Sequence, residues 1–304
     1  IVGLEIFGVL QLAHMSVGNT DNVNTMMAPL MQMKGVHGFS FDLGKEEKKG
    51  RKLQSSFTPE RVKSIGYESN FIRNCNLMLI IVASIIVVSL ILYLCTFCCK
   101  NCAPSLHSFS KRVIKEVLLT LILFNCFNFA YSAGIHFTYA PEEDSLYQLG
   151  TFAAVIAVVL PLVMALALVL TSDEGFGEFK EKFKAGNLEK MYFFVTILYR
   201  TGIGLYISTM NNDSKSTLIV LALSIAFLLY NLVNLPFAKA YHNYRANICH
   251  ISQFVCLLVS MYYRNMLKYE HIDESAASYT PAYIEISAIC ISFLVSLIVL
   301  VYEI

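Results

Sequence analysis

Arg200 is the residue whose chemistry stands out most in this sequence. It lies near the middle of a 20-residue segment, 191–210, that holds no other charged residue and is largely apolar. A charged side chain at the centre of a bilayer costs at least about 2.5 kcal/mol, so we expect it to find a polar partner: Asn125, Asn128, a tyrosine, a backbone carbonyl or water. Arg200 is then either a structural arginine, hydrogen-bonded inside a helix bundle, or a side chain that lines a path for ions or a ligand.

Three other polar residues lie in apolar segments: Asn231, Asn234 and His250. The two asparagines precede Pro236, and a proline leaves a carbonyl without its helical partner, which neighbouring polar groups can satisfy. The pattern predicts a helix kink with interhelical hydrogen bonds, and a broken helix that holds an ion is the alternative. We interpret His250 as a histidine packed inside the bundle rather than as a ligand.

Four cysteines form the pattern C-x-x-C-C-x-x-C near the end of the first long apolar segment: Cys95, Cys98, Cys99 and Cys102. A zinc site needs four thiolates aimed at one ion, whereas cysteines on a continuous helix face different directions. Palmitoylation beside the membrane and simple packing are the two main interpretations, and zinc binding is the third. Asn212 begins a glycosylation sequon, but its loop is so short that we do not expect it to be used.

Catalytic signatures are missing from the sequence. The seven histidines show no H-E-x-x-H spacing, and the chain has neither a G-x-S-x-G elbow nor a phosphate-binding glycine loop. We therefore expect no enzyme activity, no cofactor and no metal. The net charge of +1 also argues against a basic nucleic-acid-binding domain.

The elements that must position these residues are long and apolar. Of the 304 residues, 56% are hydrophobic and 15% are charged, against about 45–50% and about 25% in soluble domains. A membrane-spanning helix needs about 20 consecutive apolar residues. Seven segments meet this description: 77–99, 117–140, 149–171, 191–210, 216–238, 246–263 and 286–302. The fold class predicted is therefore all-α, a polytopic transmembrane helix bundle.

Charge in the connecting loops predicts the orientation, because Lys and Arg in short loops mark the cytoplasmic side. If the chain before residue 77 is extracellular, ten basic residues fall in cytoplasmic loops: Lys100, Lys111, Arg112, Lys115, Lys180, Lys182, Lys184, Lys190, Lys239 and Arg245. Only three fall in extracellular loops: Lys215, Arg264 and Lys268. The C-terminus at residue 304 is thus expected on the cytoplasmic side.

This orientation divides the chain into three parts. Residues 1–14 are the end of a truncated eighth helix or an amphipathic surface segment, 15–76 an extracellular loop, and 77–304 the seven-helix bundle. Three phenylalanines and three lysines at 172–186 predict a cytoplasmic helix in the membrane interface, and a charged connector is the alternative. With no initiator Met and no signal peptide, we expect the chain to be part of a longer protein.

Several short stretches resemble one family: 10–14 (LQLAH), 22–24 (NVN), 38–42 (GFSFD), 64–74 (SIGYESNFIRN), 198–200 (LYR) and 230–237 (YNLVNLPF). Together they are similar to the C-terminal membrane module of large ciliate surface proteins with cysteine-rich repeats. That module is distantly similar to the TRP-like membrane proteins of fungi. The resemblance implies a missing N-terminal ectodomain, a location at the plasma membrane with the ciliary membrane as the alternative, and a role in recognition or adhesion.

Two classes of function stay open at this point. The first is an anchoring, receptor-like membrane module whose partners are membrane lipids and other membrane or surface proteins, without nucleic acid. The second is a TRP-like ion channel or transporter with Arg200, Asn125 and Asn128 near the path. A G-protein-coupled receptor is disfavoured, because the third segment lacks Asp/Glu-Arg-Tyr and the seventh lacks Asn-Pro-x-x-Tyr.

Overall fold

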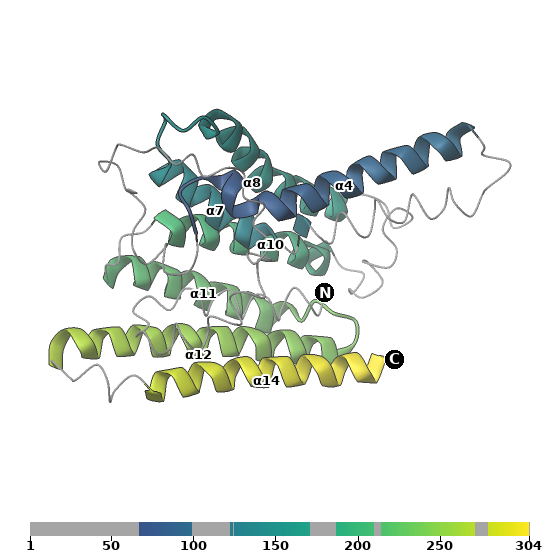
Figure 1. Cartoon of the computed structure of the whole chain (residues 1–304). Helices are drawn as coiled ribbons and strands as arrows, with labels where there is room; N and C mark the ends of the chain where they lie inside the picture. Colours follow the sequence, from purple (N-terminus) through teal and green to yellow (C-terminus); the bar gives the residue numbers. More distant parts are fainter. Residues whose placement is uncertain are drawn as a thin grey trace.

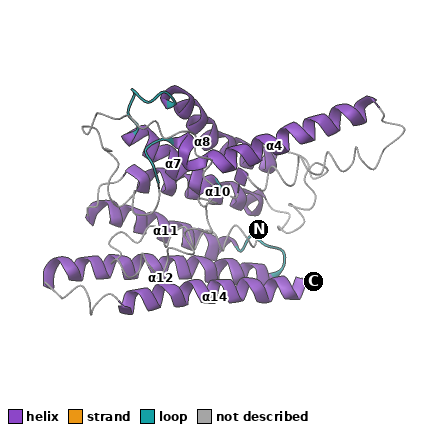
Figure 2. Cartoon of the chain, in the orientation of Figure 1, coloured by secondary structure: helices purple, strands orange, loops and turns teal. Residues whose placement is uncertain are grey.

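The computed structural model describes residues 67–98, 122–123, 125–170, 187–209, 214–270 and 279–303. These residues form α-helices joined by turns, and they include no β-strand (Figures 1 and 2). The helices are α4 (Phe71–Cys98), α7 (Cys126–Tyr139), α8 (Tyr147–Leu170), α10 (Asn187–Thr209), α11 (Ser214–Asn234), α12 (Ala240–Glu270) and α14 (Tyr279–Glu303). The all-α prediction is confirmed for this part of the chain.

Each of the seven predicted apolar segments overlaps one of these helices, but seven membrane spans are not confirmed. Within the described residues, one helix, α8, is long and apolar enough to cross a membrane. Three shorter apolar stretches lie in other helices: Met78–Leu92 in α4, Leu218–Asn234 in α11 and Cys290–Val299 in α14. The expected segment 1–14, the loop up to residue 66 and the expected interfacial helix at 172–186 lie outside the described residues.

The helices pack in two groups that meet along α10 and α11 (Figure 1). Helix α7 packs between α8 and α10, and the first half of α4 lies against α7 and α8. Helices α12 and α14 run side by side, with α11 along α12. Tyr199 of α10 joins the two groups, because its ring stacks on Phe227 of α11 at 4.1 Å between centroids and its hydroxyl pairs with Ser224 at 2.8 Å.

Small residues let α7 and α10 approach closely. A methyl group at Gly204 of α10 would lie 2.9 Å from the Phe127 carbonyl oxygen of α7. A methyl group at Gly134 of α7 would collide with the Ser208 side chain of α10. Close backbone contact through pairs of small residues is typical of helices that pack inside membranes.

The buried face of α8 carries mostly small residues, and most of its large apolar side chains point outward. Its buried positions follow one helical face: Gly150, Ala154, Ala157, Pro161, Ala165 and Leu168. Its outward face carries large apolar side chains, with Phe152 66%, Val163 55% and Leu170 75% exposed.

The α12–α14 pair also packs through small side chains. Ala288, Ser292 and Ser296 lie four residues apart on α14 and are all buried. The Cys249 thiol of α12 lies 3.8 Å from the Ser296 hydroxyl. Tyr241 and Tyr302 meet edge to face at 5.3 Å near the end of this pair.

Several helix ends differ from the predicted segments, and two of these differences have a local cause. Helix α4 begins at Phe71, inside the predicted loop 15–76, because Asn70 caps it. Helix α11 ends at Asn234, short of residue 238, and Leu235 follows in the left-handed conformation with φ 40°. Pro236 therefore stands just after a helix end, as is common, rather than at a kink. Asn243 closes this turn by binding the backbone N–H and carbonyl of Phe237 at 2.9 and 2.8 Å.

Candidate functional site

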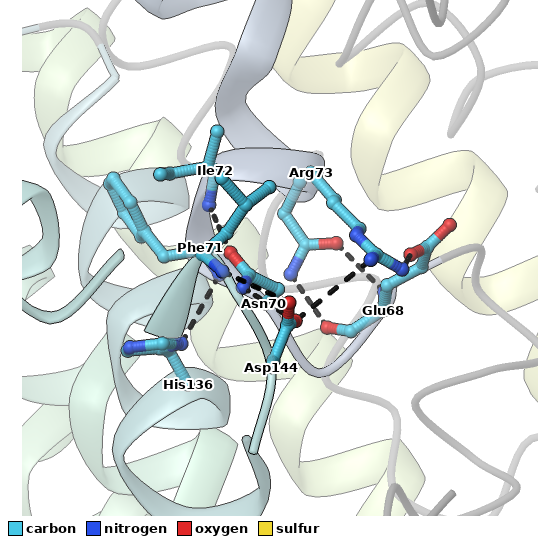
Figure 3. Close-up of polar contacts among 9 residues, drawn as sticks. Glu68, Asn70, Phe71, Ile72, Arg73, His136 and Asp144 are labelled. Atoms are coloured by element: carbon cyan, nitrogen blue, oxygen red, sulfur yellow. Dashed lines mark hydrogen bonds and ion pairs between the residues drawn. The ribbon is translucent and has the colours of Figure 1, made fainter. Parts of the chain in front are cut away.

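The densest set of polar contacts in the described structure ties the start of α4 to the α7–α8 turn (Figure 3). Asn70 lies at its centre: the side-chain Oδ1 accepts a hydrogen bond from the Ile72 amide at 2.9 Å and so caps α4. Its Nδ2 donates to Asp144 Oδ2, also at 2.9 Å. Asp144 Oδ1 in turn accepts from the Leu146 amide at 3.1 Å. We call residues 67–74, together with Asp144 and His136, the entry clamp.

Asn74 and Arg73 brace the segment that precedes the helix. Asn74 closes a loop onto Glu68: its Oδ1 accepts from the Glu68 amide and its Nδ2 donates to the Glu68 carbonyl, both at 2.7 Å. Arg73 pairs with the Glu68 carboxylate at 3.3 Å and lies 3.9 Å from that of Asp144. The Arg73 side chain is 48% exposed, so these ion pairs contribute little to stability.

His136 extends the clamp into α7 and α8. Its Nδ1 accepts a hydrogen bond of 3.4 Å from the Phe71 amide, so the ring proton must be on Nε2. The Nε2–H then donates to Thr151 Oγ1 at 3.1 Å, and the Thr151 hydroxyl donates to the Tyr147 carbonyl at 2.9 Å. Every donor in this series of hydrogen bonds meets an acceptor only when His136 is the neutral, Nε2-protonated tautomer.

Aromatic packing also holds the segment 67–71 against α7. The Tyr67 ring meets Tyr131 of α7 edge to face at 5.0 Å, and Phe71, fully buried, packs near Phe129 at 6.4 Å. Burial raises the pKa of the Tyr67 phenol, and neighbouring Tyr131 and Cys75 add to the rise. Tyr67 is therefore a neutral anchor at physiological pH.

Arg200 lies in α10 and is 5% exposed. Its Nη1 and Nη2 atoms are buried and have no hydrogen-bond partner among the described residues. The expected partner Asn128 does not fill this role, since its own Oδ1 is likewise buried without a partner. Asn125 is buried at the N-terminal end of α7, where its side chain makes no capping hydrogen bond.

The remaining predicted polar residues lie around the α11–α12 turn and on α12. Asn231 is 1% exposed, and neither its Oδ1 nor its Nδ2 has a hydrogen-bond partner in the part of the chain that the structure describes. Asn234 ends α11 and is half-buried. His250 packs against the Phe227 ring at 4.9 Å, with its Nε2 3.4 Å from the Tyr192 hydroxyl, so its contacts are those of a histidine inside the bundle.

The predicted modification sites lie at or beyond the edge of the described structure. Cys95 and Cys98 belong to the last turns of α4, whereas Cys99, Cys102 and Asn212 lie outside the described residues. Within the described residues, no three His, Cys, Asp or Glu side chains are grouped to hold a metal ion.

The entry clamp and the small-residue contacts do not follow from the features singled out in the sequence. The clamp has one local signal, an Asn immediately before a helical segment, but its partner Asp144 is 74 positions away. The packing face of α8 has a clearer signal, the helical spacing of Gly150, Ala154, Ala157 and Ala165.

Comparison with known proteins gives the chain no relative: no family model, no curated protein and no solved structure matches it. The described part of the chain is an all-helical bundle in which one helix, α8, is long and apolar enough to cross a membrane.

Proposed function

We propose that the chain is the multi-pass membrane module of a larger cell-surface protein. The module anchors that protein in the membrane and, like a receptor, couples the extracellular part to the helix bundle. The observation that carries the proposal is how α8 arranges its side chains by size: Gly and Ala line most of the buried face, and Phe, Val and Leu line the exposed face. In water the large apolar side chains would turn inward. In lipid no hydrophobic force acts between helices, and small residues line the contacts.

Three other helices also expose large apolar side chains, which is the basis for proposing further spans beside α8. These side chains are about half exposed or more: Val87, Leu90 and Leu94 on α4, Leu218 and Val233 on α11, and Leu294, Ile298 and Val301 on α14. Hydroxyl and amide side chains lie inside instead: Ser132, Ser224, Asn231, Ser292 and Ser296. Exposed apolar side chains on several helices mark a surface that contacts a partner or a membrane, and lipid acyl chains are its natural contact.

The entry clamp supports the coupling. The chain that enters α4 is bound through Asn70 and Arg73 to Asp144 in the α7–α8 turn. A force or rotation applied to the preceding segment would therefore reach α7 and α8 through hydrogen bonds rather than through a loose linker. The acidic α7–α8 turn and the segment before α4 meet at one end of the bundle, which agrees with the extracellular side expected for both from the loop charges.

Partners and location follow from this proposal. The outward faces would contact membrane lipids, and other membrane or surface proteins would assemble with the module at the plasma membrane or the ciliary membrane. The role in recognition or adhesion rests on the family resemblance of the sequence alone.

An epitope placed before residue 67 tests the proposal. Antibody should stain it on intact cells, and alkaline carbonate should leave the chain in the membrane fraction. Release of the chain by carbonate, or staining only after permeabilisation, would contradict the proposal.

An ion channel or transporter is the second candidate, and one observation favours it: the charged, enclosed Arg200 in the middle of α10. Ion flux through liposomes that contain the parent chain, compared with Arg200→Ala and Arg200→Gln variants, tests this function. A flux that both substitutions change would support this function. The absence of any flux from folded parent protein would rule it out.

A further inference from the structure

Arg200 presents hydrogen-bond donors that nothing in the described structure uses. The guanidinium is 5% exposed, and its Nη1 and Nη2 atoms are buried without a partner. An arginine side chain stays charged under all physiological conditions. A buried charge without a counter-charge is strongly destabilising, because the surroundings cannot replace water.

The surroundings of Arg200 add a further donor. Cys126 of α7 interacts with Arg200 and Thr201 across the α7–α10 contact, and the Thr201 hydroxyl is buried with no nitrogen or oxygen partner among the described residues. The acidic side chains that the structure describes, Glu68, Glu142, Glu143 and Asp144, belong to the entry clamp or the α7–α8 turn, and Arg200 forms no ion pair within the described residues. The α7–α10 contact thus combines one positive charge, N–H and O–H donors, and no anion.

We propose that Arg200 and Thr201 form a binding site for a small monovalent inorganic anion of the halide class, between α7 and α10. A halide is a single negative charge that accepts hydrogen bonds from several directions, which suits two guanidinium nitrogens and a hydroxyl. A multiply charged anion such as phosphate would leave excess charge inside the bundle. The inference does not depend on whether the module conducts ions, because a bound halide also neutralises Arg200 in a module that only anchors.

The experiment uses the full chain in lipid nanodiscs, with sodium chloride replacing sodium gluconate at constant ionic strength. Binding to the folded state alone raises the unfolding temperature, and a hundredfold excess over the dissociation constant should raise the Tm by about 5 °C or more. Broadening of the chloride-35 NMR line by the parent protein reports binding without unfolding.

Three variants sharpen the test. Arg200→Gln keeps a polar side chain and removes the charge, so both chloride effects should disappear. Thr201→Val keeps the shape and removes the hydroxyl. The chloride concentration that gives half of the response should therefore rise about 2- to 10-fold. Arg73→Gln removes an exposed arginine from the entry clamp and should leave the chloride response unchanged.

Two results would overturn the proposal. One is a parent chain whose Tm and NMR line width are the same in chloride and gluconate, a result that stands even if Arg200→Gln fails to fold. The other is an Arg200→Gln variant that folds and keeps the full chloride response. Either result would leave the membrane and coupling proposals untouched, because those rest on α8 and the entry clamp.

Discussion

Asn70 and Asp144 are joined by a 2.9 Å hydrogen bond between side chains that are 74 positions apart. The same Asn70 side chain caps α4 through the Ile72 amide. One residue therefore starts a helix and fixes that helix to the turn between two others. Filling both roles at once needs an amide, because a carboxylate could accept the capping hydrogen bond but could not donate one to Asp144.

The first prediction concerns this pair. Asn70→Asp keeps the cap, loses the bond to Asp144 and places two carboxylates together, so the unfolding free energy should fall by about 1–3 kcal/mol. Adding Asp144→Asn restores a donor and an acceptor with exchanged roles and should recover most of the loss. Thermal unfolding of the two single variants and the double variant measures this. A double variant whose loss equals the sum of the single losses would show that the two side chains do not interact.

The second prediction compares two glycines on α10. Gly204→Ala would place its methyl group 2.9 Å from the Phe127 carbonyl, and forcing α7 and α10 apart should cost about 1–3 kcal/mol. Gly202→Ala meets nothing within 4 Å and should be neutral or stabilising, because Ala favours a helix by up to about 1 kcal/mol over Gly. Equal effects of the two changes on the Tm would contradict the close α7–α10 contact.

The third prediction concerns His136. Its contacts with Phe71 and Thr151 require the neutral ring with the proton on Nε2. Nitrogen-15 NMR of the side chain at neutral pH should show that tautomer, and Thr151→Val should alter the Nε2 signal. A protonated ring, or a proton on Nδ1, would mean that the Phe71 amide is not bound as described.

The fourth prediction uses two successive residues of α8, one on its buried face and one on its exposed face. Ala165 is fully buried and Leu166 is 40% exposed. Ala165→Leu should destabilise the bundle by about 1–3 kcal/mol through overpacking. Leu166→Ala should change stability in nanodiscs by no more than about 0.5 kcal/mol, as expected of an outward side chain. The opposite order of effects would indicate that α8 faces the other way.

The sequence predicted the helices well, because length and apolar composition are local properties. Each of the seven apolar segments overlaps a helix, and His250 has the packed surroundings expected of it, whereas among the described residues only α8 meets the length and apolarity of a membrane span. Helix ends were less accurate: the cap at Asn70 starts α4 early, and the turn closed by Asn243 ends α11 at Asn234. These ends are set by single side-chain hydrogen bonds that hydropathy does not report.

The polar contacts could not be predicted in the same way, because they depend on which helix faces meet. Asn128 was one of several partners expected for Arg200, yet among the described residues the Asn128 Oδ1 and the Arg200 Nη atoms are left without a hydrogen-bond partner. The pairing of Asn70 with Asp144 requires the fold of α7 and α8 to be known first. Small-residue spacing is the one pattern in the sequence that would have identified the packing faces, as Gly204 and Ser208 on α10 illustrate.

Site-specific labelling tests the central claim, a multi-pass membrane module, most directly. Single cysteines are introduced as Glu143→Cys in the α7–α8 turn and Lys239→Cys in the α11–α12 turn, both exposed positions, after the native cysteines are replaced. A membrane-impermeant maleimide should label Glu143→Cys on intact cells and Lys239→Cys only after permeabilisation. Equal labelling of both positions on intact cells would contradict the account.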